Sequence, residues 1–192
     1  MKEQNSQSSR TRTEKIRARE AIDAESRRIF SETACDAILA SEEYANAKTI
    51  LIYEAIRAEL SLSKLAAAAK ADGKRLAYPV CVTDCEFKAY IPLTGERIKG
   101  RFGIEEPDPD ASLPVEPDDI DLVICPCTAF DKELHRIGMG GGFYDRFLPK
   151  CGKAAVFAVA FEAQEAELIR PEPHDFVMDA VVTEKRVLRR KR

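Results

Sequence analysis

The sequence predicts an α/β protein: a single three-layer domain with a doubly wound, mostly parallel sheet and helices on both faces. Short apolar runs rich in β-branched residues alternate with helical patterns along the chain, which is typical of such sheets. Residues 48–53 and 75–79 are two such runs with a helical pattern between them, a length that suits a crossover between parallel strands. The chain has 192 residues, so we expect residues 1–192 to form one domain.

The N-terminal part is expected to be helical. Residues 1–9 are polar, and we expect them to be disordered. Apolar residues at spacings of three and four then predict one helix over residues 10–39, with residues 41–46 as a connection. The start of this helix is basic. A solvated helix face explains such a run; the alternative is that Arg12 or Arg19 folds over a bound anion.

The rest of the chain alternates between apolar runs and turn signals. We expect strands over residues 48–53, 75–79, 86–91, 121–126, 153–161 and 178–183, helices over residues 62–71 and 162–169, a loop over residues 54–61 and a basic tail over residues 184–192. The strand at 86–91 alternates and should pair with the strand before it. The strand at 153–161 is the longest apolar run and the best candidate for a central strand of the sheet.

Residues 92–119 are rich in proline and acidic residues and show no periodicity. We expect a long loop, and long loops in compact domains are usually functional or mobile. Residues 101–107 are expected to form a packed island inside it.

The composition is that of a soluble globular protein, with 45% apolar and 33% charged residues. A net charge of −3 argues against broad nucleic-acid binding. We see no membrane span and no secretory signal, so we expect a cytoplasmic monomer with small-molecule partners. Six cysteines are expected to be free in that compartment. Zinc is less favoured, because Cys81 with Cys85 and Cys125 with Cys127 lack the usual spacing.

A glycine-rich stretch, RIGMGGGFYDRFL at residues 136–148, is the strongest candidate for a binding site. Its four glycines let a ligand approach the backbone closely, and helical spacing after Phe143 indicates that the loop begins a helix. The N-terminus of a helix attracts anions. Arg136 and Arg146 suit phosphate oxygens, and Asp145 could hold Mg²⁺. The stretch is neither a Walker loop nor a dinucleotide motif, and a flexible surface turn is the alternative.

The expected topology places this stretch beside other polar residues. Ligands of doubly wound sheets lie beyond the carboxyl ends of the strands. Loops over residues 54–61, over residues 126–142 and after Phe161 leave those ends. Glu59, the glycine stretch and Asp179 are therefore expected to form one site.

The stretch at residues 136–148 resembles the signature of the 5-formyltetrahydrofolate cyclo-ligase (5,10-methenyltetrahydrofolate synthetase) family. The likeness covers nearly the whole chain, because other segments follow in the family's order. These are EYANAKTILIY (43–53), GKRLAYP (73–79), GRFGIEEP (100–107), DLVICP (121–126), AFD (129–131) and PHD (173–175), with Asp179, Thr183 and Glu184 after them.

The resemblance implies ATP-dependent closure of 5-formyltetrahydrofolate to 5,10-methenyltetrahydrofolate through a phosphorylated formyl group, with release of ADP and phosphate. Such chemistry needs positioning and charge neutralisation more than a covalent side chain, and Arg136 and Tyr144 are candidates for that role. The implied ATP contacts are Arg12, Arg136, Ile137, Gly138, Met139, Gly140, Gly141, Gly142, Phe143 and Tyr144. The implied folate contacts are Glu54, Glu59, Met139, Gly140, Gly141, Gly142 and Phe143. Mg²⁺ is implied at Asp145 and Asp179.

Four positions depart from the family's pattern. Ser8 stands where the family often has lysine, Ser61 and Leu62 where an acid and threonine are common, and Leu134 at a usual glycine. None of these changes touches Asp145 or the glycines.

Other functions remain open on the residues alone. One is a paralogue that activates another amide-like substrate with ATP, and another is a folate- or nucleotide-binding protein without turnover. A sugar-phosphate isomerase or a CoA-transferase-like enzyme is disfavoured, because Asp145 would have no purpose there. We expect Arg146 to be a structural ion-pair residue rather than a catalytic one.

Overall fold

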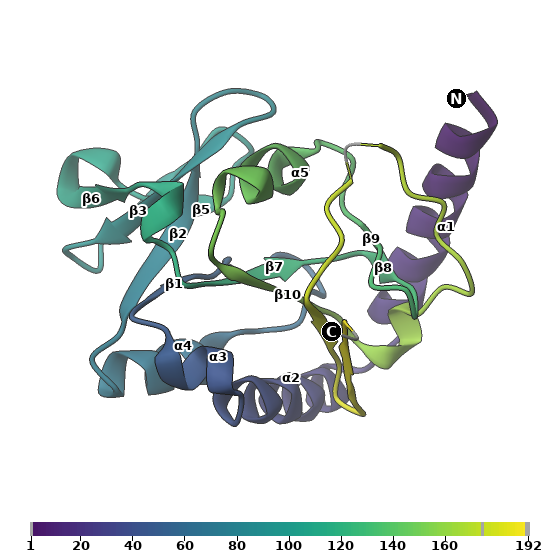
Figure 1. Ribbon diagram of the computed structural model, residues 1–192, viewed down its shortest axis with the longest axis horizontal. Coiled ribbons are helices and arrows are strands. Elements are labelled where there is room, and N and C mark those ends of the chain that lie inside the picture. Colours follow the sequence, from purple (N-terminus) through teal and green to yellow (C-terminus); the bar gives the residue numbers. More distant parts are fainter. Residues whose placement is uncertain (1, 174, 191–192) are drawn as a thin grey trace.

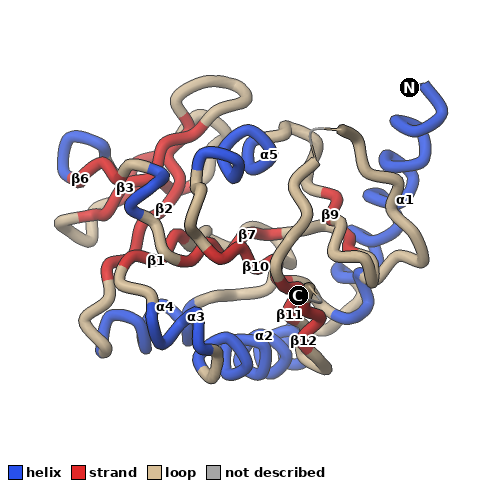
Figure 2. The backbone as a smooth tube through the Cα atoms, viewed as in Figure 1, coloured by secondary structure: helices blue, strands red, loops and turns tan. Residues whose placement is uncertain are grey.

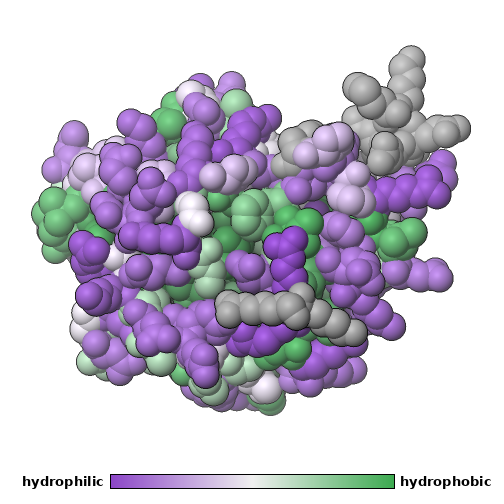
Figure 3. Space-filling model, viewed as in Figure 1, coloured by the Kyte–Doolittle hydropathy of each residue, from purple (hydrophilic) through white to green (hydrophobic). Residues whose placement is uncertain are grey.

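The computed structural model describes residues 2–173 and 175–190. Met1, the last two residues and His174, which belongs to the PHD segment, lie outside the described residues. No helix within the described ranges is both long and apolar enough to cross a membrane. The face in Figure 3 is largely hydrophilic, with apolar side chains showing in patches between the charged ones.

A mixed eight-stranded sheet forms the centre of the molecule (Figures 1 and 2). In spatial order its strands are β12 (Val187–Arg189), β11 (Ala180–Val182), β10 (Ala155–Val159), β7 (Leu122–Pro126), β1 (Thr49–Leu51), β2 (Arg75–Cys81), β3 (Phe87–Pro92) and β6 (Ser112–Val115). The five strands from β11 to β2 are parallel to one another, whereas β12, β3 and β6 pair antiparallel. The mostly parallel α/β sheet is therefore confirmed. The strand β10 pairs on both sides, with β11 and β7, and is buried, so it is a central strand as expected.

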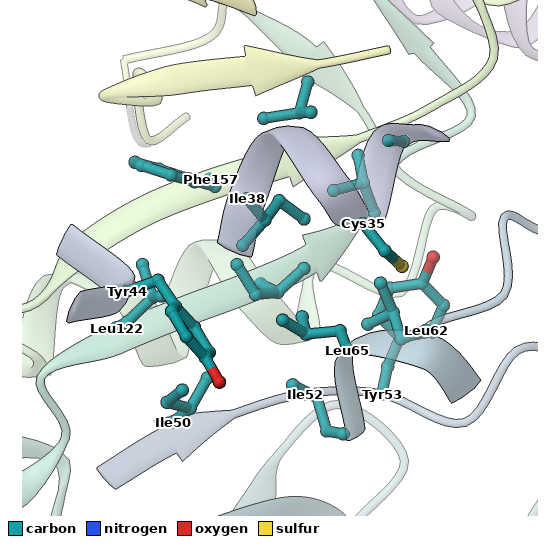
Figure 4. Close-up of a cluster of buried hydrophobic side chains, with 14 of the residues drawn as sticks. Cys35, Ile38, Tyr44, Ile50, Ile52, Tyr53, Leu62, Leu65, Leu122 and Phe157 are labelled. Carbon is teal, nitrogen blue, oxygen red and sulfur yellow. The ribbon is translucent and has the colours of Figure 1, made fainter. Parts of the chain in front are cut away.

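Helices cover both faces of this sheet, because its central strands bury side chains alternately on each side. The helices are α1 (Lys2–Glu20), α2 (Ala24–Leu39), α3 (Glu42–Asn46), α4 (Ser63–Ala71) and α5 (Phe143–Phe147). On one face, Ile38 of α2 and Leu65 of α4 pack with Ile50 and Leu122 (Figure 4). On the other face, α5 packs over a second cluster that includes Leu51 and Val123.

The N-terminal region differs from the expected single helix. Residues 2–9, expected to be disordered, belong to α1, which is consistent with their lack of glycine and proline. The chain then breaks before α2, where Asp23 accepts a hydrogen bond from the Ser26 amide at 2.9 Å. Such a cap satisfies an otherwise unpaired N–H group at a helix start. Ser41 caps α3 in the same way, so the connection expected at residues 41–46 is a short helix.

Residues 92–119 are ordered secondary structure rather than a loop. They contain a hairpin of β4 (Arg97–Lys99) and β5 (Glu105–Pro107), two 3-10 turns (Pro109–Ala111 and Pro117–Asp119), and the edge strand β6. Buried Glu106 anchors the hairpin, because its carboxylate accepts a hydrogen bond from the Cys81 amide at 3.1 Å. Strands of three or four residues are too short to show a period in the sequence.

The C-terminal segment also departs from expectation. Residues 162–169 form only a single 3-10 turn (Glu162–Gln164), because the buried Gln164 amide donates to the carbonyls of Cys127 and Thr128. The basic tail supplies the edge strand β12, where Ala180 pairs with Arg189. The strand expected at residues 178–183 therefore does not close the sheet.

Leu134 occupies the left-handed region with φ of 68°, although it is not a glycine. We expect Leu134→Gly to lower the free energy of unfolding by about 1–4 kcal/mol. Glycine would relieve about 1 kcal/mol of backbone strain, but deleting this 4%-exposed side chain forfeits about 2–5 kcal/mol of packing. Urea denaturation measures the difference.

A matched control is Arg57→Gly, since Arg57 also has a positive φ of 52° but an exposed side chain. That variant should be as stable as the parent or slightly more stable. If Leu134→Gly were stabilised to the same degree, backbone strain rather than packing would dominate at residue 134.

Candidate functional site

The glycine stretch leaves the carboxyl end of β7 through a small hairpin of β8 (Ala129–Phe130) and β9 (Arg136–Ile137), and it leads into α5 (Figure 2). Gly140 has φ of +101° and Gly142, the residue before α5, has φ of +65°. Residues with a side chain rarely adopt either conformation. The backbone itself therefore requires glycine at these two positions, and the loop begins a helix as expected.

Arg12 lies against this loop, although 126 positions separate it from Gly138 in the chain. Its Nε donates to the Gly138 carbonyl at 2.8 Å. Its guanidinium carbon lies 3.5 Å from where a Cβ at Gly140 would be. Helix α1 thus holds a cation over the glycine loop, which favours the anion-contact interpretation of Arg12 over that of a solvated helix face.

Arg146 supports the loop from the other side. Its Nη1 donates to the carbonyls of Gly141 at 2.7 Å and Cys85 at 3.2 Å. These contacts connect the loop to the turn between β2 and β3. The contacts are structural, as expected, but they are made to backbone carbonyls rather than through an ion pair.

Arg136 and Asp145 form an ion pair below the loop. The Arg136 Nη2 lies 2.8 Å from the Asp145 Oδ1, with 3% and 16% of the two side chains exposed. The Arg136 guanidinium also lies 5.9 Å from the centre of the Tyr144 ring. Asp145 is therefore held in place by a buried cation while part of it reaches the surface beside the glycines.

Asp179 does not join Asp145. Its Oδ2 accepts a hydrogen bond from the Val156 amide at 2.9 Å, near the beginning of β10. Val156 pairs with Val123, near the beginning of β7. This is the amino end of the parallel strands, whereas the glycine loop departs from the carboxyl end. Among the residues that the structure describes, no three His, Cys, Asp or Glu side chains come together as a metal site.

Two acidic side chains follow the carboxyl end of β1. Glu54 is exposed, and its Oε1 pairs with the Arg97 Nη2 at 2.9 Å. Glu59 is buried, with 7% of its side chain exposed; its Oε1 lies 3.6 Å from the Arg19 Nη1 and its Oε2 accepts from the Ile56 amide at 3.1 Å. Burial raises the pKa of Glu59, although the Ile56 amide and Arg19 oppose the change.

The remaining predicted contacts line the loop in different ways. Ile137 is buried in β9, while Met139 is 47% exposed. The Phe143 ring packs at right angles to Phe102, with 5.7 Å between centroids, and stacks on Phe87. Phe143 therefore joins the loop to the tip of the β4–β5 hairpin.

Several buried donors in this region have no hydrogen-bond partner among the described residues: the Nε and Nη2 of Arg19, the Nε of Arg136 and the hydroxyl of Tyr144. Arg136 lies 5.9 Å from the centre of the Tyr144 ring, and Arg19 lies 3.6 Å from Glu59, whose charge, with that of Arg136, acts on the pKa of Tyr144. Burial raises the pKa of Tyr144, so its hydroxyl stays protonated. Unpaired buried donors are costly, and a ligand rich in acceptor atoms would satisfy them.

Sequence reasoning assigned no role to the pairing of Arg19 with Glu59. One signal was present: Arg12 and Arg19 are seven residues apart, which places them on the same face of a helix. All six cysteines are free, and Cys125 and Cys127 are buried beneath this site.

Comparisons with known proteins agree on one family. Residues 3–184 match the model of the 5-formyltetrahydrofolate cyclo-ligase family. A 5-formyltetrahydrofolate cyclo-ligase of Haemophilus influenzae is 31% identical over 139 residues, covering 69% of this chain and 74% of that protein. The enzyme of that name from Escherichia coli is 29% identical over 175 residues, covering 88% and 96%.

Solved structures give the same result. The NMR structure of Aquifex aeolicus 5,10-methenyltetrahydrofolate synthetase matches with a TM-score of 0.83 and 31% identity, covering 95% of this chain and 92% of that one. A 5,10-methenyltetrahydrofolate synthetase from Mycoplasma pneumoniae has the same fold, with a TM-score of 0.76 at 21% identity, covering 92% and 98%.

Proposed function

Because this chain belongs to the 5-formyltetrahydrofolate cyclo-ligase family and is an enzyme of that kind, we propose that it uses ATP to close its folate substrate at the carboxyl edge of the sheet. The product is 5,10-methenyltetrahydrofolate, released with ADP and phosphate. The observation that carries this location is the position of Arg12 over a glycine loop whose backbone requires glycine at Gly140 and Gly142.

The proposed reaction has two steps. The formyl oxygen attacks the γ-phosphorus of ATP, and the bond from phosphorus to ADP breaks. The nitrogen on the p-aminobenzoate arm then attacks the activated formyl carbon, loses its proton, and phosphate leaves with the former formyl oxygen. Both steps require neutralisation of charge on phosphate oxygens. We assign this role to Arg12, Arg136 and the backbone N–H groups from Gly138 to Tyr144.

Asp145 fits a magnesium ion at this site. Mg²⁺ in nucleotide enzymes is commonly held by one or two carboxylates, substrate phosphates and water, so Asp145 suffices without Asp179. Its side chain is partly exposed beside the loop and is oriented by Arg136. Bound there, Mg²⁺ would neutralise phosphate charge. The folate would lie along the loop and against the acids that follow β1, Glu54 and Glu59.

The decisive experiment follows the absorbance of the methenyl product with 5-formyltetrahydrofolate, with and without ATP and Mg²⁺, while ADP is measured in parallel. We expect product to form only with both, and one ADP per product. Product formed without ATP, or ADP formed without product, would contradict the proposal.

We further propose a cytoplasmic monomer in which residues 1–192 act as one domain on small molecules, with no nucleic-acid partner. The six free thiols suit a reducing compartment, and the net charge of −3 disfavours a polyanion. Light scattering across a range of protein concentrations tests the oligomeric state.

We expect the KM for 5-formyltetrahydrofolate to rise as the pH falls, beginning at a higher pH than for an ordinary glutamate. Burial raises the pKa of Glu59, and only the ionised carboxylate can accept hydrogen bonds fully. Above this pKa the KM should be flat, and below it the KM should rise by up to about tenfold per pH unit. Steady-state kinetics at saturating ATP measure this dependence.

Glu59→Gln should raise the KM at every pH and flatten the profile in this range. Glu32→Gln, an exposed change on α2, should keep both the KM and the slope. A Glu59→Gln enzyme with an unaltered pH profile would show that another group titrates.

A further inference from the structure

Arg19 is a buried guanidinium whose donors are largely unused. Its side chain is 1% exposed, and the nearest carboxylate oxygen, Oε1 of Glu59, is 3.6 Å from Nη1, beyond a normal hydrogen bond. Its Nε and Nη2 have no partner among the residues that the structure describes. An arginine stays charged when buried, and a charge removed from water needs compensating acceptors. The chain provides one distant carboxylate, so a ligand atom is needed to complete the arrangement.

Glu59 and Arg19 together present complementary groups. The carboxylate can accept a ligand N–H, and the guanidinium beside it can donate to a ligand carbonyl. This combination matches the edge of a lactam ring, in which an N–H stands next to a C=O. The pterin ring of a folate has such an edge. The adenine ring of ATP has no carbonyl, so the pair suits the folate rather than the nucleotide.

The position of Arg19 on α1 agrees with a folate whose pterin ring lies at the pair of Arg19 and Glu59. Arg12 and Arg19 are seven residues apart on one helix, which corresponds to about 10 Å along its axis. Arg12 lies on the glycine loop, where the phosphates are proposed to bind, and Arg19 lies at the far end of that span. In 5-formyltetrahydrofolate the lactam carbonyl neighbours the ring nitrogen that carries the formyl group. A donor that holds this carbonyl therefore also sets the direction of the formyl group.

We propose that Arg19 positions the substrate and determines specificity: its Nε and Nη2 donate to the lactam carbonyl of the pterin ring, while Glu59 accepts the neighbouring N–H. This inference rests on the proposed function. In this arrangement α1 supplies one cation for each substrate, Arg12 for the nucleotide and Arg19 for the folate.

The test uses folic acid and aminopterin as competitive inhibitors against 5-formyltetrahydrofolate, because aminopterin has an amino group in place of the lactam carbonyl and consequently lacks the hydrogen on the neighbouring ring nitrogen. A carbonyl accepts from Arg19, whereas an amino group cannot. We expect Arg19→Gln to shift the ratio of the two inhibition constants towards aminopterin by about tenfold. The KM for 5-formyltetrahydrofolate should rise at least about tenfold, while the KM for ATP stays within about twofold.

Two further variants separate this role from a structural one. Arg19→Lys keeps the charge but not the fork of donors. The ratio of its two inhibition constants should therefore fall between that of the wild type and that of Arg19→Gln. Arg28→Gln, on the exposed side of α2, should leave all constants unchanged. If Arg19→Gln does not fold, Arg19→Lys alone carries the comparison of inhibitors.

If Arg19 and Glu59 only stabilised the fold, the comparison of inhibitors would give a different result. Arg19→Gln would then lower the melting temperature and weaken both inhibitors equally, leaving their ratio unchanged, and this would overturn the inference. A wild-type enzyme that makes no methenyl product would count against the proposed function itself. An active wild type with an unchanged inhibitor ratio would count only against the role of Arg19.

Discussion

Asp145→Asn is expected to reduce kcat by about a hundredfold or more, the loss typical of removing one preorganised electrostatic contact to a transition state. The carboxylate is proposed to hold Mg²⁺ against the phosphates, and a neutral amide binds that ion poorly. The Mg²⁺ concentration needed for half-maximal rate should also rise. Rapid-quench measurement of ADP formation across a Mg²⁺ titration detects both changes.

Asparagine is preferable to alanine at this position. The Arg136 Nη2 lies 2.8 Å from the Asp145 Oδ1, and the arginine side chain is 3% exposed. Alanine would leave that cation unpaired and could cost about 3–5 kcal/mol of stability, whereas the asparagine oxygen can still accept the hydrogen bond. Asp36→Asn, an exposed change on α2, serves as the control. Wild-type turnover and Mg²⁺ dependence in Asp145→Asn would refute the metal role.

Gly140→Ala is expected to raise the KM for ATP at least about tenfold and to lower kcat. A φ of +101° is strained for any residue with a Cβ, at a cost of about 1–3 kcal/mol. The new methyl group would also lie 3.5 Å from the Arg12 guanidinium, in the space where phosphate oxygens are proposed to approach the backbone. Steady-state kinetics at saturating folate and isothermal titration with ATP measure the effect.

Gly73→Ala separates backbone strain from ligand contact. Gly73 has φ of +70°, no neighbouring atom lies within 4 Å of the position that an added methyl group would take, and the residue lies in the turn after α4. This variant should lose about 1 kcal/mol of stability with unchanged kinetic constants. If Gly140→Ala behaved in the same way, the loop would not be the phosphate site.

Local patterns predicted most of the fold. The alternation of apolar runs with helical periods determined the α/β class, and the crossover between β1 and β2 followed from its length. The capping residue Asp23 was visible in the sequence, but the apolar period continued across it and concealed the break between α1 and α2. The short strands β4, β5 and β6 were missed because three or four residues carry no measurable period. The hairpin of β4 and β5 is held in place by the buried contact of Glu106 with the Cys81 amide.

The candidate site was predicted in part. The glycine loop, Glu59 and Asp145 follow the carboxyl ends of strands, so topology alone brings them to one edge. Asp179 precedes β11, and a residue at the start of a parallel strand lies at the opposite edge. The prediction that Asp179 lies beside Asp145 did not take the direction of this strand into account, and it is wrong.

The sequence by itself determined that a glycine-rich loop leads into a helix, which strands are buried, and which family the chain resembles. The first two properties are local, because they depend on the chemistry of neighbouring residues, and the resemblance is a sum of such local segments. Only the tertiary structure decided that Arg12 lies on Gly138 and that Arg19 is buried against Glu59. Such contacts join segments that are distant in the chain, and they depend on how α1 packs across the carboxyl edge of the sheet. The packing of many side chains sets that position, and no short stretch of sequence encodes it.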